Sequence, residues 1–186
     1  DLAGALTKAD YKRDRRQNTR PWDNYDGHTK RYSAVYNQQL GSLGFIDQAE
    51  FNWMFFSHES KRDFHVGMSK VAGQSWNPSL PADIVQNSPR DFKVWGTEPR
   101  LSMNIDGDSV NQQWIVGGRF VSEKIDYQVR QKTLATGTTA VTRDWSFDDK
   151  AWAGYISNAV KLFNDTLTIT PGMRFEHVNE KYTDQK

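Results

Sequence analysis

The chain has 186 residues, a formal net charge of +1 and 37% hydrophobic residues, as expected of a polar folded protein with a single domain. It has no run of about 18 apolar residues, which excludes a membrane helix, and no cysteine, which excludes disulfides and thiolate sites. A transmembrane β-barrel remains compatible with this composition, because only every second residue of a barrel strand has to be apolar.

The first 27 residues are polar and irregular. We expect a loop there, with one or two helical turns over residues 6–11 and Thr7 as the N-cap. The segment also contains a basic cluster of five side chains: Lys12, Arg13, Arg15, Arg16 and Arg20. Such a cluster is either a solvated loop or an electrostatic attractor for an anion at the mouth of a site.

Three β-hairpins are predicted from paired segments over residues 28–58, 92–127 and 151–178. Their tight turns are expected at Gly41-Ser42, Asp106–Asp108 and Asn164-Asp165. Successive side chains of a strand point to opposite faces, which gives a largely apolar face and a charged face everywhere except in 151–163, where the alternation is weak. The apolar face should carry Tyr36, Phe51, Trp53, Trp95, Leu101, Trp114, Phe120, Ile169 and Met173.

Long connections over residues 59–91 and 129–150 alternate with these short turns. In a meander all short turns lie on one rim and all long loops on the other, as in outer-membrane barrels with short periplasmic turns and long extracellular loops. We therefore predict an all-β fold, an antiparallel meander that forms part of a transmembrane β-barrel, with 1–27, 59–91 and 129–150 as extracellular loops. Pro99 and Pro171 fall in mid-strand and require bulges or local unpairing. A soluble β-sandwich is the structural alternative, although its strands should be shorter.

Four segments resemble a known family. Residues 95–102 (WGTEPRLS) and 167–176 (LTITPGMRFE) look like barrel strands of TonB-dependent outer-membrane receptors. The first of these, together with residues 2–7 (LAGALT) and 14–21 (DRRQNTRP), resembles the ferric-citrate-type branch. The resemblance implies that the chain is a fragment, with about six strands of a barrel of about 22. The plug domain, the TonB box and the signal sequence typical of the family are absent from this sequence.

The resemblance further implies a transporter in the outer membrane of a Gram-negative bacterium. It would contact membrane lipid, bind an iron chelate such as ferric citrate, and receive energy from the TonB complex through the missing N-terminal part. No intrinsic cofactor, metal site, nucleic-acid partner or enzymatic activity is expected, and the four histidines form no His-Glu-x-x-His motif. Another siderophore or haem is the alternative cargo, and His65 is then the only histidine in a long loop.

Candidate ligand contacts are arginines, because the guanidinium fork donates two parallel hydrogen bonds to a carboxylate. The alternation places Arg31 and Arg90 on the charged face, near the rim with the long loops. We expect one of Arg15, Arg16 or Arg20 to contact the ligand with them. A salt bridge in the wall or a loop is the other interpretation of each. Six charged residues farther down the wall are expected to pair with one another and to face the plug: Glu98, Arg100, Arg119, Glu123, Arg174 and Glu176.

A function of another class is also open. A soluble β-rich module could bind carbohydrate through Trp53, Trp76, Trp95 and Trp145. Extraction separates the two classes, because a barrel needs detergent and a soluble module does not.

Overall fold

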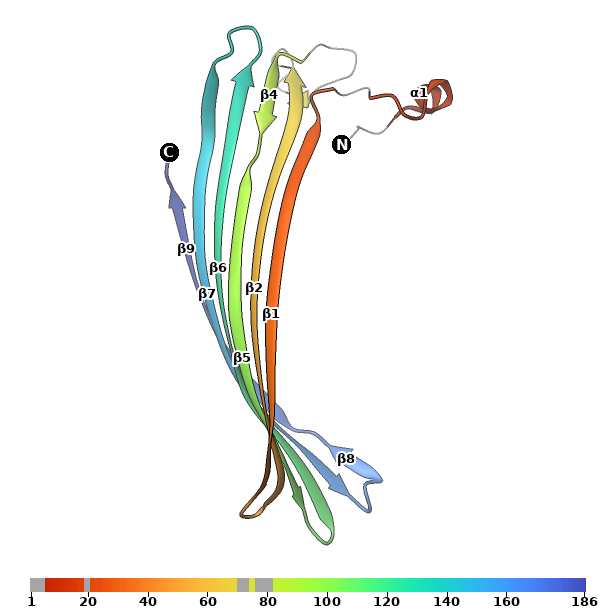
Figure 1. The fold of residues 1–186 in the computed structure, drawn as a ribbon, viewed down its shortest axis with the longest axis vertical. Coiled ribbons are helices and arrows are strands. Elements are labelled where there is room, and N and C mark those ends of the chain that lie inside the picture. Colours follow the sequence, from red (N-terminus) through yellow and green to blue (C-terminus); the bar gives the residue numbers. More distant parts are fainter. Residues whose placement is uncertain (1–5, 19–20, 70–73, 76–81) are drawn as a thin grey trace.

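A computed structural model describes residues 6–18, 21–69, 74–75 and 82–186, and shows a tall curved sheet with one short helix near its upper end (Figure 1). The helix α1 spans Lys8–Arg13 and begins at Thr7, whose side chain accepts a hydrogen bond from the Asp10 amide, as the sequence predicts. The strands are β1 Asn24–Leu43, β2 Ile46–Ser69, β3 Gln74–Ser75, β4 Ile84–Asn87, β5 Arg90–Asp106, β6 Val110–Thr133, β7 Thr139–Leu162, β8 Leu167–Ile169 and β9 Gly172–Asp184.

All strand pairings are antiparallel, and the nine strands form one sheet. Strands β4 and β5 follow one another in the space between β2 and β6, and β8 and β9 both pair with β7. The sheet is therefore a meander of six strand positions, which confirms the predicted fold class. In the described part of the chain, no strand pairs with the outer edge of β1 or of β9.

The three short turns lie together at the lower end of the sheet, as predicted (Figure 1). Two of them lie where the sequence places them, between β5 and β6 and between β7 and β8. The prediction of a turn at Gly41-Ser42 is wrong. Strand β1 continues through a β-bulge at Gly41, and the chain turns at Gly44-Phe45. Both glycines have positive φ, of 70° and 62°, so either could have supplied the turn conformation.

The strands reach much farther toward the upper rim than the sequence predicts. Residues 59–69 continue β2 instead of opening a loop, and β6 and β7 leave only residues 134–138 between them in place of a connection over 129–150. The apolar alternation stops before these segments, but backbone pairing with the neighbouring strands continues through polar residues. No helix in the described residues is long and apolar enough to cross a membrane.

Both mid-strand prolines interrupt the pairing, as predicted. Pro99 has a partner on β2, but the register with β6 omits Glu98 and Pro99. Pro171 lies in the gap that separates β8 from β9. Proline has no amide hydrogen to donate, so the sheet loses its ladder bonds locally at these two positions.

The two faces of the sheet differ in exposure. In the central part of β7, exposed residues such as Lys150 and Trp152 alternate with half-buried residues such as Ala151 and Tyr155. Side chains diverge on the outside of a curved sheet and converge on its inside, so the more exposed set marks the convex face. The register carries this assignment to every strand and resolves the faces of 151–163.

The convex face carries the nine residues predicted to share an apolar face, which confirms that part of the prediction. Its aromatic side chains form a chain of ring contacts from Phe55 to Trp95, Phe120 and Trp152, with centroid distances of 6.4, 5.0 and 4.2 Å.

From Ile105 to Trp95 the apolar stretch of β5 covers about 33 Å at about 3.3 Å per residue. A tilt of about 40° reduces this to a height of about 25 Å.

On the concave face, Gly96 lies where a side chain cannot fit. A Cβ atom there would lie 2.5 Å from Cζ of Phe56 and 2.7 Å from the backbone oxygen of Phe120. We expect Gly96→Ala to lower the free energy of unfolding of the full-length protein by about 1–3 kcal/mol, because the carbonyl cannot move without breaking the ladder. Gly154→Ala is the control, since its Cβ would meet no atom within 4 Å. Urea unfolding measures both variants, and equal midpoints would contradict this packing.

Candidate functional site: an arginine–aromatic cluster on the concave face

The lower part of the concave face carries charged side chains that satisfy one another. Arg119 Nη1 lies 3.9 Å from Glu98 Oε2 on the neighbouring strand, and the Tyr155 hydroxyl donates a hydrogen bond of 3.1 Å to Glu98. Arg100 donates to Asn52 Oδ1 at 2.7 Å, and Arg174 pairs with Glu176. Of the six charged residues expected to pair here, Arg119 and Glu98 pair across neighbouring strands, Arg174 and Glu176 pair within β9, and Arg100 bonds a neutral amide instead.

The upper part of the same face differs, because arginines there contact rings instead of carboxylates. Arg62 and Arg90 are direct cross-strand neighbours, and the same register continues through Tyr127 on β6 and Trp145 on β7. We call the set Arg62, Phe64, Arg90, Phe92, Tyr127, Arg143 and Trp145 the arginine–aromatic cluster. Like charges placed directly opposite each other destabilise a sheet, so this pair costs free energy unless an anion lies between them.

Arg90 is held rigidly in the cluster. Its guanidinium carbon lies 4.6 Å from the ring centroid of Tyr127 and 5.7 Å from that of Phe64. Its Nε atom is buried and has no hydrogen-bond partner, and no carboxylate of the described residues lies within ion-pair distance. Arg90 as a whole is only half-buried, so an anionic ligand could reach the remaining N–H groups of its guanidinium and supply a charged acceptor.

Two further arginines extend the cluster over neighbouring strands. Arg62 lies 5.2 Å from the Phe92 ring, and among the described residues it donates one long hydrogen bond, of 3.4 Å to Ser60 Oγ. Arg143 lies 5.0 Å from the Trp145 ring. Cation–π contacts of this kind hold the side chains in place and leave N–H groups free for a ligand.

Tyr182 borders the cluster from β9, with its ring centroid 5.9 Å from that of Trp145. Desolvation and then the charge of Asp184 raise the pKa of the Tyr182 hydroxyl above its ordinary value. The raised pKa extends to higher pH the range in which the hydroxyl is neutral and can donate a hydrogen bond.

The sequence-predicted ligand residues are not all brought together. Arg31 shares the concave face, but it lies two strands and four residues from the Arg90 register position, about 16 Å between Cα atoms. It has no ion pair or hydrogen bond with a described residue, and it is exposed. Arg15 and Arg16 follow α1 and are exposed, while Arg13 pairs with Asp10 at 3.0 Å. Arg20 lies outside the described residues.

The residues of the alternative interpretations are dispersed. Trp53 and Trp95 lie on the convex face and Trp145 on the concave face, while Trp76 lies outside the described residues. The three described tryptophans therefore form no common platform for a sugar. His65 lies on the convex face, where its Nε2 is 3.1 Å from Asp63 Oδ2, so it does not face the cluster.

Sequence reasoning missed Arg62 and Arg143 because both fall in segments assigned to long loops. The sequence did contain a sign that Arg62 lies on this face. Every second residue after Phe56 points to the same side of the strand, and this series includes Ser60, Arg62 and Phe64. Polar strands lack the apolar alternation by which strands are recognised, so only the pairing partner reveals them.

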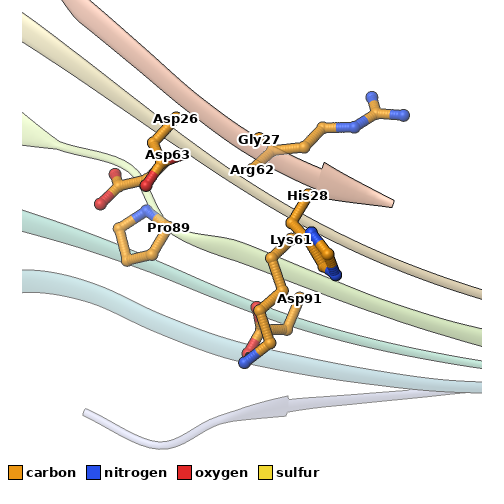
Figure 2. A pocket seen from close by; sticks show the side chains of 8 residues that line it. All are labelled: Asp26, Gly27, His28, Lys61, Arg62, Asp63, Pro89 and Asp91. Carbon is orange, nitrogen blue, oxygen red and sulfur yellow. The ribbon is translucent and has the colours of Figure 1, made fainter. Parts of the chain in front are cut away.

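A hollow on the other face of the same strands has a different chemistry. It is lined by Asp26, Gly27, His28, Lys61, Arg62, Asp63, Pro89 and Asp91. Figure 2 shows the Arg62 side chain extending away from those of Lys61 and Asp91, which lie 3.4 Å apart as an ion pair. Among the described residues, no three His, Cys, Asp or Glu side chains are placed to hold a metal ion.

No family model matches the chain. Among solved structures, it is similar to the crystal structure of the ferric citrate transporter FecA in the unliganded form, with 28% sequence identity and a TM-score of 0.76. The match covers 100% of this chain and 26% of that chain, so the chain spans about a quarter of the transporter's length. Both the meander and this match show that the chain has the fold of a FecA-like barrel fragment.

Proposed function

We propose that the chain is part of an outer-membrane TonB-dependent receptor that transports an anionic iron chelate such as ferric citrate. The observation that carries this proposal is Arg90, a cation fixed between two rings on the concave face with no carboxylate partner in the described residues. Ferric citrate presents carboxylates, which match the donor geometry of arginine. The likeness to a ferric citrate transporter supports the same ligand class.

The convex face supports a position in the outer membrane. Its apolar stretch of about 25 Å equals the height of the lipid-facing band of outer-membrane barrels. Further strands outside this chain would pair with β1 and β9 and close the barrel, because an unpaired edge of such length invites aggregation. The concave face then lines the lumen, and the upper rim faces the cell exterior.

Ligand capture would proceed in two stages. Arg15 and Arg16 are exposed near the upper rim and attract the anion through solvent, where the Debye length is about 8 Å at physiological salt. The arginine–aromatic cluster then binds the chelate, and Arg31 lies deeper on its path. Another siderophore or haem is the alternative cargo, but the described residues include no histidine in the cluster.

The function is tested on the purified full-length protein, which should require detergent and bind ferric citrate saturably. Stopped-flow measurement should show that Arg15→Gln/Arg16→Gln slows association several-fold at low salt, flattens its salt dependence and leaves dissociation unchanged. The control Lys132→Gln lowers the charge at the same rim and should change less. A protein that dissolves without detergent, or that ignores ferric citrate, contradicts the proposal.

A further inference from the structure

On the convex face, lysine follows aromatic residues in a repeated step. Three strands place a lysine two residues beyond their last apolar-band aromatic, in the direction of the upper rim: Tyr32 then Lys30 on β1, Trp95 then Lys93 on β5, and Trp152 then Lys150 on β7. Two residues along a strand keep the same face and cover about 6–7 Å. The step therefore places three ammonium groups just above the aromatic boundary of the apolar band.

Lys124 on β6 completes this group, because it is the direct cross-strand neighbour of Lys93. We call Lys30, Lys93, Lys124 and Lys150 the lysine belt. All four are exposed, and none lies within ion-pair distance of a carboxylate of the described residues. Glu59 and Asp148 lie in the same register but make no ion pair with these lysines.

We propose that the lysine belt binds the phosphate groups of anionic lipids in the surrounding membrane leaflet. This inference rests on the proposed function, since it needs the convex face to contact lipid. Aromatic side chains gather at the boundary between hydrocarbon and headgroups, so the next position outward lies at headgroup depth. Four exposed lysines at that depth, two of them directly opposite each other, match a layer of negative phosphates, and they outnumber the two carboxylates, Glu59 and Asp148, in the same register.

The neighbouring surface strengthens the choice of a lipid over a soluble anion. The next positions toward the rim carry Asp91, Asp126 and Lys61, and Lys61 pairs with Asp91, so the row above the belt adds no unpaired lysine and the zone follows the sheet across its strands. A site for a small anion would instead converge on one point from several directions. A zone at one depth fits a headgroup layer.

The test uses the full-length receptor and native mass spectrometry in the presence of equal amounts of phosphatidylglycerol and phosphatidylcholine. Wild type should retain phosphatidylglycerol preferentially. The variant Lys30→Gln/Lys93→Gln/Lys124→Gln/Lys150→Gln should lose this preference by at least about tenfold, because each lysine near an anionic surface contributes roughly fivefold. The matched control Lys8→Gln/Lys12→Gln/Lys132→Gln/Lys161→Gln removes the same charge elsewhere and should keep it.

Three outcomes would overturn the lysine belt: an unchanged preference in the belt variant, an equal loss in the control, or abolition of the preference by excess inorganic phosphate. Replacing the same four lysines by arginine should preserve the preference for phosphatidylglycerol. This variant keeps the positive charges, so it distinguishes an effect of charge from an effect of misfolding. Ferric-citrate binding should be intact in the belt variant. If ferric citrate fails to bind even to wild type while the lipid preference depends on the belt, the proposed cargo is wrong and the lipid site stands.

Discussion

Replacing Arg90 by alanine in the full-length receptor is expected to raise the Kd for ferric citrate by roughly 10- to 150-fold. Hydrogen bonds to charged groups contribute about 1.5–3 kcal/mol each, and Arg90 is already held in position by Tyr127 and Phe64. Little side-chain entropy is then lost when the chelate binds. The loss should lie mainly in faster dissociation, measured by surface plasmon resonance or by isotope-labelled iron release.

Two further variants make this expectation specific. Arg90→Lys should recover binding only in part, because an ammonium group cannot donate two parallel bonds to a carboxylate. Arg130→Ala is the control: it removes an arginine at the same rim whose guanidinium already donates to Gln128 at 2.9 Å. Unchanged affinity in Arg90→Ala, or an equal loss in Arg130→Ala, would remove Arg90 from the site.

Leu101→Arg is expected to destabilise the full-length receptor in lipid vesicles by about 2–4 kcal/mol. Leu101 lies in the apolar stretch of the convex face, with Phe51 and Val116 as its cross-strand neighbours. A cation at this depth would have to enter hydrocarbon, which carries a penalty of that size in outer-membrane barrels. The shift of the urea unfolding midpoint measures it.

Ser102→Arg is the matched control, since adjacent residues of a strand point to opposite faces. Ser102 lies on the concave face, with Glu50 as its cross-strand neighbour, so an arginine there faces polar side chains. We expect a change below about 0.5 kcal/mol. Equal destabilisation by both substitutions would contradict the assignment of Leu101 to the lipid face and of Ser102 to the polar face.

Side-chain parity was the most predictable property of this chain. The period of two in the lower strands assigned Leu101 and Phe120 to one face and Glu98 and Arg119 to the other, and the register confirms both assignments. The N-cap Thr7 was predictable for a similar reason, because a cap depends on a few adjacent residues. The fold class was predicted from the alternation of short and long connections, and it is confirmed although β2, β6 and β7 extend into the segments predicted as long loops.

Strand ends and the cluster were less predictable, because they depend on partners far away in the sequence. Gly41 and Gly44 are both permitted in a turn, and only pairing with β2 decides between turn and bulge. Arg62 becomes part of a binding face only because β5 pairs with β2 as far as Arg90. The sequence around Arg62 does not show which strand pairs with β2. The contribution of Arg62 to the site is therefore seen only in the structure.

The meander also determines how the sheet can be assembled. Each of the six strand positions pairs with the next position in chain order, so the hairpins close short loops with a small entropic cost. Contact order within this chain is therefore low for a β protein, and pairing can spread from one hairpin to the next. Only the open edges of β1 and β9 need partners from distant sequence. Closure at those edges should therefore set the rate at which the receptor folds.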